Sequence, residues 1–264
     1  MPDTARDLIP AMPPVRKMDY RVGRKLGHRA RIGAVVLASD ETMEYEFRTV
    51  LGALDDGVAL YHARIENSPE ITPETLRAME GKIAGTARLL LPQSPMDVVA
   101  YGCTSASVAI GPERVSELLL EAEPTAKVTN PATAAVEALR ALGVQRLAIL
   151  TPYQESVNVF FGEFFADQGF DIAAFGSFLE DNDAAVAAID PESVSEAVIE
   201  LGSDPNVDGV FVACTSTRLL GLAAETERKL GKPVTSSNHA IIWHSLRLGG
   251  IDDKMPQFGK LYAL

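Results

Sequence analysis

One short phrase occurs twice in this chain, and each copy contains one of its only two cysteines. Residues 98–105 read Val-Val-Ala-Tyr-Gly-Cys-Thr-Ser, and residues 210–216 read Val-Phe-Val-Ala-Cys-Thr-Ser. In both copies, an apolar run typical of a strand buried on both faces ends in Cys-Thr-Ser. The repetition therefore predicts two similar halves, each with a cysteine where a strand ends and a loop begins.

A second pair of phrases repeats with nearly the same offset, at residues 32–39 and 147–153. Apolar runs alternate with helical patterns along the chain, which predicts parallel sheets with right-handed crossover connections. The predicted strands are 32–38, 58–65, 97–101, 146–150, 172–178, 209–213 and 233–235. The predicted helices are 42–54, 72–90, 111–121, 133–142, 155–168, 191–201, 217–230 and 239–248.

The chemistry that this pattern permits depends on the two thiols. Ligands of parallel sheets bind beyond the carboxyl ends of the strands, where Cys103 and Cys214 are expected. Two thiols on opposite sides of one small molecule can act as base and acid. The hydroxyl and backbone N–H groups of the following Thr-Ser pairs can stabilise a thiolate, or hold a substrate carboxylate while it becomes an enediolate.

Other uses of the cysteines are weaker predictions. A single buried cysteine is most often a small apolar core residue, but two of them in matching phrases favour a shared site. The chain has no CxxC pair beside a histidine cluster, so we expect no metal site. A redox role through a disulfide, and a non-catalytic protein that binds a metabolite in the same place, remain alternatives.

Composition limits the partners and the compartment. A chain of 264 residues with 47% apolar content can form two modest α/β domains. Its net charge of −12 argues against nucleic acid or anionic membrane as a partner. We expect a cytoplasmic protein with free thiols, because no apolar run is long enough to span a membrane and no signal pattern opens the chain.

Other polar residues follow predicted strands. Tyr153 ends the second-half phrase where Ser39 and Asp40 end the first-half phrase. A tyrosine there can donate a hydrogen bond to a carboxylate, although a packing role is nearly as plausible. Asn182 lies in the loop after the strand at 172–178, and such a residue equally often starts a helix.

Together these motifs resemble the aspartate/glutamate racemase superfamily. They are the paired cysteines, Thr-Pro-Tyr at 151–153, Asp-Asn at 181–182, and Gly-Lys-Pro-Val-Thr-Ser-Ser-Asn at 231–238 with Trp-His at 243–244. The branch that the chain most resembles contains maleate cis-trans isomerases, arylmalonate decarboxylases and ectoine-utilisation racemase-like proteins. The resemblance covers roughly residues 30 to 250.

The resemblance implies an α/β fold of two pseudo-symmetric domains, each a parallel, flavodoxin-like sheet flanked by helices, with the active site in the cleft between them. The implied division is an N-terminal arm at 1–27, a first domain at 28–130 plus 235–264, and a second domain at 131–234. The implied enzyme is an isomerase or racemase that needs no cofactor, forms a homo-oligomer, and acts on a small carboxylate that is amino-acid-derived or an unsaturated dicarboxylate.

Carried onto this sequence, the resemblance makes Cys103 and Cys214 the catalytic pair. The substrate-binding residues that it implies are Ser39, Asp40, Thr104, Ser105, Tyr153, Asn182, Thr215 and Ser216. Racemases of this kind move an α-proton between two thiols, whereas maleate isomerases add one cysteine to the double bond. A malonate-type decarboxylase is the alternative, but arylmalonate decarboxylases keep only the second cysteine, so Cys103 argues against simple decarboxylation.

The chain departs from the pattern at Asp40, where maleate isomerases usually carry an asparagine. An ionised aspartate would repel a dianionic substrate at close range. The departure therefore favours a ligand that presents an ammonium, amidine or hydroxyl group there, and it favours racemisation. The alternative is that Asp40 only caps its helix and points away from the site.

Overall fold

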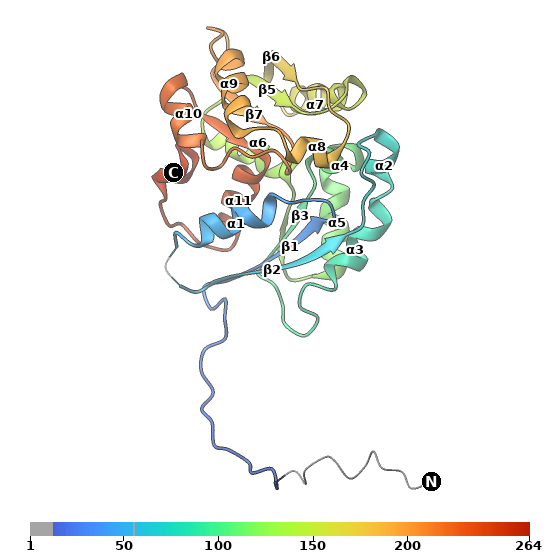
Figure 1. Ribbon diagram of the computed structural model, residues 1–264, viewed down its shortest axis with the longest axis vertical. Helices are drawn as coiled ribbons and strands as arrows, with labels where there is room; N and C mark the ends of the chain where they lie inside the picture. Colours follow the sequence, from blue (N-terminus) through green and yellow to red (C-terminus); the bar gives the residue numbers. More distant parts are fainter. Residues whose placement is uncertain (1–12, 55) are drawn as a thin grey trace, which may run out of the picture.

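The structure is a computed structural model that describes residues 13–54 and 56–264. Residues 13–27 form no helix or strand, are almost entirely exposed, and lead away from the body as an extended arm (Figure 1). The arm at 1–27 remains a prediction. The part of that prediction that covers residues 1–12 lies outside the described residues.

Among the residues that the structure describes, eight strands form two separate four-stranded sheets, and every pair of neighbouring strands is parallel. The first sheet has the order β2-β1-β3-β4 and the second has the equivalent order β6-β5-β7-β8. The bounds are β1 Ala30–Leu37, β2 Val58–Ile65, β3 Val98–Gly102, β4 Lys127–Thr129, β5 Arg146–Thr151, β6 Asp171–Ser177, β7 Gly209–Val212 and β8 Val234–Ser236. The predicted α/β class with two pseudo-symmetric parallel sheets is confirmed.

Helices flank both sheets (Figure 1). Those up to the start of the second sheet are α1 Met43–Leu51, α2 Pro73–Arg77, α3 Glu80–Ala87, α4 Thr104–Ile110, α5 Pro112–Ala122 and α6 Pro131–Ala141. The later ones are α7 Glu155–Asp167, α8 Asp183–Ala187, α9 Pro191–Gly202, α10 Ala223–Leu230 and α11 Ser237–Leu248, followed by 3₁₀ turns at Pro256–Phe258 and Leu261–Ala263.

Three sequence predictions about helices were wrong. The single helix predicted at 72–90 is two helices, α2 and α3, because the chain bends around Ala78. A helix was missed directly after the first cysteine, where α4 consists mainly of small and β-branched residues that carry little helical pattern. The helix predicted to start at 217 starts only at Ala223, after a turn that other elements hold in place.

The two sheets share one apolar core. A continuous cluster of buried side chains runs from the first sheet, through Val35 and Tyr101, to the second sheet, through Ile149 and Phe211. The last helix, α11, leaves the second sheet and packs against α6 and α1. The prediction of a discontinuous first domain depends on this return of the chain. The exact division into domains remains a prediction.

The strand order explains where a site can form. In the first sheet, β1 connects to β2 on one side and β3 connects to β4 on the other, so the chain changes direction between β1 and β3. The second sheet has the same change of direction between β5 and β7, and a crevice opens at such a point in each sheet. Cys103 follows β3 and Cys214 follows β7. Both thiols therefore lie at these switch points.

Candidate active site

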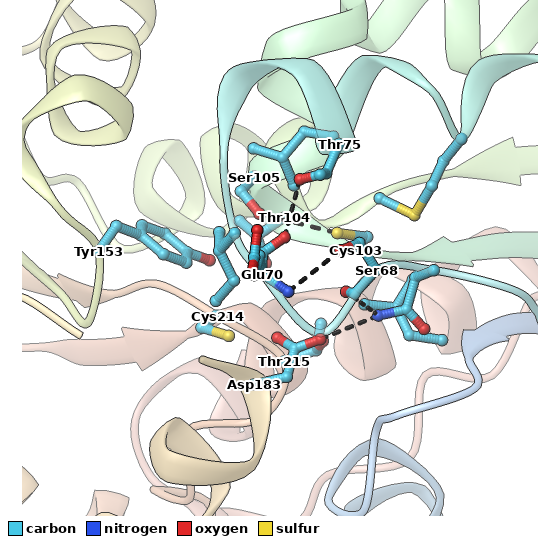
Figure 2. Close-up of a pocket in the computed structure, with 15 residues that line it drawn as sticks. Ser68, Glu70, Thr75, Cys103, Thr104, Ser105, Tyr153, Asp183, Cys214 and Thr215 are labelled. Atoms are coloured by element: carbon cyan, nitrogen blue, oxygen red, sulfur yellow. Dashed lines mark hydrogen bonds between the residues drawn. The ribbon is translucent and has the colours of Figure 1, made fainter. Parts of the chain in front are cut away.

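One pocket receives side chains from the carboxyl ends of both sheets (Figure 2). Its walls include both cysteines, which come from different lobes. The residues that line it are Leu37, Asn67, Ser68, Glu70, Ile71, Thr75, Leu76, Met79, Cys103, Thr104, Ser105, Tyr153, Asp183, Cys214 and Thr215. The sequence predicted that the two strand-end thiols share one site, and both of them line this pocket.

The pocket is narrow. Its free volume is about 20 Å³, which is close to the space that one water molecule needs. The segment after β2 borders it and pairs with the start of α8: the Ile71 N–H donates to the Asp181 carbonyl at 2.9 Å, and the Asp183 N–H donates to the Pro69 carbonyl at 3.2 Å. A molecule of several heavy atoms therefore needs the walls to move apart before it can bind.

Cys103 is the N-terminal cap of α4 and has an ordinary extended backbone, with φ −142° and ψ 116°. Its sulfur lies 3.7 Å from the Ser105 hydroxyl. Burial raises the pKa of this thiol to about 12, and the hydrogen bonds from the Ala106 N–H and from Ser105 offset only part of that rise. In this structure Cys103 is therefore a neutral thiol.

Cys214 has a strained backbone. Its φ of 81° lies in the left-handed region, which a residue with a Cβ adopts only at a cost of order 1–3 kcal/mol. Burial raises the pKa of its thiol to about 12, and the negative charge of Asp183 adds to the rise. Strain of this kind is concentrated at functional sites, where it fixes the direction of a side chain.

The Tyr153 hydroxyl is a donor at the centre of the pocket. Its ring is buried against Phe161, with the ring centroids 5.2 Å apart. Its hydroxyl points into the space between the cysteines (Figure 2), where the Cys214 thiol and the Ser105 hydroxyl are its neighbours, and it has no hydrogen bond of ordinary geometry to any described residue. A buried hydroxyl without a well-formed hydrogen bond is available to a molecule that enters the pocket.

The threonines of the repeated phrase have structural partners. The Thr104 hydroxyl donates to Ser237 at 2.7 Å, and the Thr215 hydroxyl donates to the Gly102 carbonyl at 3.4 Å. The second bond joins the end of one cysteine phrase to the start of the other. Ser105 lines the pocket, whereas Ser216 is buried outside it, where its backbone N–H bonds to Cys214 and its carbonyl accepts from Thr42.

Besides Ser216, three more predicted substrate-binding residues lie outside the residues that line the pocket. Asp40 Oδ1 accepts from the backbone N–H groups of Thr42 and Met43 at 2.8 and 2.7 Å, so Asp40 caps the start of α1. Its charge nevertheless lies near the site, where it raises the pKa of Cys214. Asn182 caps α8 through its side-chain oxygen. Ser39 donates to Asp183 at 2.6 Å.

Sequence reasoning missed Asp183. This residue follows Asn182 and lines the pocket, with one carboxylate oxygen bound by Ser39 and by Asn67 at 2.9 Å. The only signal was its place directly after the Asp-Asn pair of the loop. Which of three adjacent polar residues faces inward depends on where α8 begins, and the sequence did not reveal that start.

Two further acids are buried beside the pocket. Glu46 on α1 accepts from the Leu219 and Leu220 N–H groups, at 3.3 and 3.1 Å, in the loop after Cys214. Burial raises its pKa to about 7, and the nearby charge of Asp40 contributes. Burial likewise raises the pKa of Asp40. Acidic groups therefore surround the thiols without a matching cation.

The described residues contain no group of three or more His, Cys, Asp or Glu side chains placed to hold a metal ion. Both cysteines are free thiols. In the same part of the chain, every helix is too short or too polar to cross a lipid bilayer.

Two parallel sheets with the same strand order, each contributing a cysteine to a common pocket, define the chain as a member of the aspartate/glutamate racemase superfamily. Residues 59–262 match the family model described as arylmalonate decarboxylase. The chain therefore belongs to the arylmalonate decarboxylase family. The resemblance predicted from the sequence is confirmed.

The chain is similar to two kinds of characterised protein in this family. It is 30% identical to the arylmalonate decarboxylase of Bordetella bronchiseptica over 196 residues, which are 73% of this chain and 81% of that one. It is 28% identical to the maleate isomerase of Nocardia farcinica over 239 residues, which are 88% of this chain and 94% of that one.

Solved structures give the same result. The Nocardia farcinica maleate cis-trans isomerase bound to TRIS superposes with a TM-score of 0.81 and 28% identity, over 89% of this chain and 98% of that one. A mutant of that enzyme with a covalently bound succinylcysteine intermediate superposes with a TM-score of 0.82 and 27% identity, over the same shares. The prediction that this chain is an enzyme of the isomerase branch is confirmed.

Proposed function

We propose that the chain isomerises a small carboxylate held between Cys103 and Cys214. The observation that carries the proposal is that one thiol from each lobe and the unpartnered Tyr153 hydroxyl line one narrow pocket. If the cysteines had only a packing role, they would lie in separate apolar interiors. A protein that only bound a metabolite would not need two thiols at equivalent strand ends.

Two related reactions fit a pair of opposed sulfur atoms. In racemisation, one thiolate takes the α-proton, the electron pair of the broken C–H bond moves into the carboxylate, and the other thiol gives a proton to the opposite face. In cis-trans isomerisation, a thiolate adds to the double bond, the resulting single bond rotates, and the C–S bond then breaks again. Both routes pass through a charged carboxylate that needs hydrogen-bond donors.

The proposed roles follow from what each donor already binds. Tyr153 has an uncommitted hydroxyl and is proposed as the main donor to the substrate carboxylate, with Ser105 beside it. Thr104 and Thr215 are proposed to contribute to substrate binding by forming part of the pocket wall. Ser39, Asp40, Asn182 and Ser216 are proposed to act indirectly, because their side chains or backbones hold the pocket's walls.

Relatives support cis-trans isomerisation as the first reaction to test, since four of the relatives at this level of similarity are named maleate isomerase. Decarboxylation of a malonate-type acid is the second candidate, and the family match and the 30% identical arylmalonate decarboxylase favour it. It predicts release of CO₂ that requires Cys214 and survives Cys103→Gly.

The test measures turnover directly. The protein is incubated in D₂O with maleate, with α-amino acids and with an arylmalonate, and NMR follows double-bond geometry, α-deuteration and loss of CO₂. We expect Cys103→Ala and Cys214→Ala to abolish isomerisation or exchange. Ser195→Ala, a buried serine bonded only to Thr226 in the second lobe, is the matched control. Full turnover in either cysteine variant would refute the two-thiol proposal.

Two broader expectations accompany the proposal. A homo-oligomer is expected from the resemblance, and light scattering on the purified chain measures its mass. A cytoplasmic location is expected from the sequence, and fractionation of the source cells tests it. Neither expectation changes the chemistry proposed for the pocket.

A further inference from the structure

Asp183 is the one buried acidic side chain in the wall of the pocket. It is 5% exposed, and it reaches the pocket from α8 beside Cys214 (Figure 2). One of its oxygens, Oδ2, accepts from the Ser39 hydroxyl at 2.6 Å and from the Asn67 amide at 2.9 Å. Both donors are neutral, so the carboxylate is hydrogen-bonded but carries no compensating charge.

No cation within the described chain balances Asp183. Among the described residues that line the pocket, Glu70 is the other charged one, and none is lysine or arginine. Arg64 on the neighbouring strand donates to the carbonyls of Leu37, Ala38 and Asp40 and to the Glu44 carboxylate, so its charge is used elsewhere. The described ion pairs do not include Asp183.

A dicarboxylate is a poor match to this wall. Burial raises the pKa of Asp183, while the hydrogen bonds from Ser39 and Asn67 favour its ionised form. When Asp183 is ionised, a second carboxylate beside it is repelled at short range. A cationic nitrogen at the same place would instead form a charge-assisted hydrogen bond with the free carboxylate oxygen. At the other side of the pocket, the Tyr153 hydroxyl is a buried donor without a partner, which suits one carboxylate.

We propose that Asp183 makes this pocket select a substrate with one carboxylate and one cationic nitrogen, such as an α-amino acid or a close derivative, over a dicarboxylate. The inference rests on the proposed function, which puts the reacting carbon between the two thiols. Tyr153 binds the carboxylate, Asp183 binds the nitrogen, and the α-carbon between them faces Cys103 and Cys214.

This arrangement also couples binding to activation of the thiols. Burial is the largest cause that raises the pKa of both cysteines, and the charge of Asp183 adds to it. A bound cation offsets the contribution of Asp183, which favours loss of a proton from one thiol to solvent when the substrate binds. The thiolate then takes the α-proton and forms an S–H bond, while the opposite thiol gives its proton to the other face of the carbon.

The test uses matched ligands and matched variants. Each α-amino acid is paired with its N-acetyl derivative, which keeps the carboxylate and loses the cation, and maleate represents the dicarboxylates. Binding is measured as protection of the cysteines from alkylation by iodoacetamide, a neutral reagent, and turnover is measured as deuterium exchange. The protein is compared with Asp183→Asn, whose amide oxygen can still accept from Ser39 and Asn67.

We expect the unaltered protein to prefer an amino acid over its N-acetyl partner and over maleate, and Asp183→Asn to reduce that preference by about tenfold or more. Asp183→Asn should also alkylate faster in the absence of ligand, because the thiols lose a neighbouring negative charge. Ser195→Ala removes a buried hydroxyl that is bonded to Thr226, away from this pocket, and it should leave the preference unchanged.

The results separate this inference from the proposed function. If Asp183→Asn leaves the preference unchanged, or if the unaltered protein binds maleate better than every amino acid, the selection by Asp183 is refuted. If the cation preference is present but no ligand is turned over, selection stands and the proposed isomerase activity fails.

Discussion

The two cysteine-bearing strand ends begin from nearly the same sequence and reach different structures. After β3 the backbone stays extended at Cys103, and helix α4 begins at the next residue. After β7 the backbone turns into the left-handed region at Cys214, and the next helix begins only at Ala223. The repeated phrase thus determines where each thiol is, but not the local conformation around it.

Contacts from the first lobe explain the difference. The loop after Cys214 is held by Thr42, which donates to the Ser216 carbonyl at 3.0 Å, and by Asn238, which donates to the Thr215 carbonyl at 2.7 Å. Glu46 accepts from the backbone of the same loop. Side chains from distant parts of the chain therefore satisfy some of the loop's N–H and C=O groups, and turns within the loop satisfy others.

The largest expected effect is on kcat, when the Tyr153 hydroxyl is removed. Tyr153 follows β5, whereas the matching end of β1 carries Asp40, which is used as a helix cap. Tyr153→Phe should lower kcat by about 10²–10³-fold, as loss of one oxyanion donor does elsewhere. It should also stabilise the fold, because a buried hydroxyl without a partner is removed. Steady-state kinetics and urea unfolding measure the two effects, and a destabilised Tyr153→Phe protein would contradict the assignment.

The next prediction concerns Glu46, which joins the first lobe to the Cys214 loop. Its pKa rises from 4.5 to about 7 on folding, so the folded state binds its proton more tightly than the unfolded state. The resulting stability is complete below pH 4.5 and is lost as pH rises through 7, by up to about 3 kcal/mol. Glu46→Gln should remove most of this decline. Burial also raises the pKa of Asp40, so the slope that remains in Glu46→Gln should have the same sign.

Urea unfolding of both proteins at pH 5 and pH 8 checks this prediction. The glutamine keeps an oxygen to accept from the Leu219 and Leu220 N–H groups, and it gains an amide that can donate to the unpartnered oxygens of Asp40 and Asn238. An equal fall in stability with pH in the two proteins would show that the Cys214 loop does not depend on a protonated Glu46.

The smallest effect compares the two cysteines directly. Glycine adopts a positive φ without the Cβ clash, so Cys214→Gly should be more stable than Cys214→Ala by about 1 kcal/mol. At Cys103, where φ is −142°, glycine has no such advantage. Urea unfolding of all four variants gives the comparison. Equal glycine-minus-alanine differences at the two sites would mean that the backbone at Cys214 is not strained.

Much of the fold could be predicted because its signals are local. The apolar strands at 98–102 and 209–212 appear almost where the pattern put them, since a strand buried on both faces must be apolar throughout. The break between α2 and α3 and the short helix α4 were missed, because no proline or glycine marks the break and small residues give α4 no apolar stripe.

The site was predictable to a similar extent. Cys103, Cys214, Tyr153, Thr104, Ser105 and Thr215 were identified from strand ends and resemblance, and all of them line the pocket. Asp183 was not identified, and Asp40 and Asn182 proved to be helix caps. A cap and a ligand use the same residue types, so only the position of the helix start separates them.

By itself, the sequence determined the two parallel sheets and the presence of a thiol at the switch point of each. Short apolar runs are enough to predict buried strands and the residues at which they end. The tertiary structure decided which acid faces the thiols, why Cys214 is strained and Cys103 is not, and how a buried glutamate holds the loop between lobes. Those features depend on contacts between residues more than 100 positions apart, such as Ser39 with Asp183 and Glu46 with Leu219, and no local pattern encodes them.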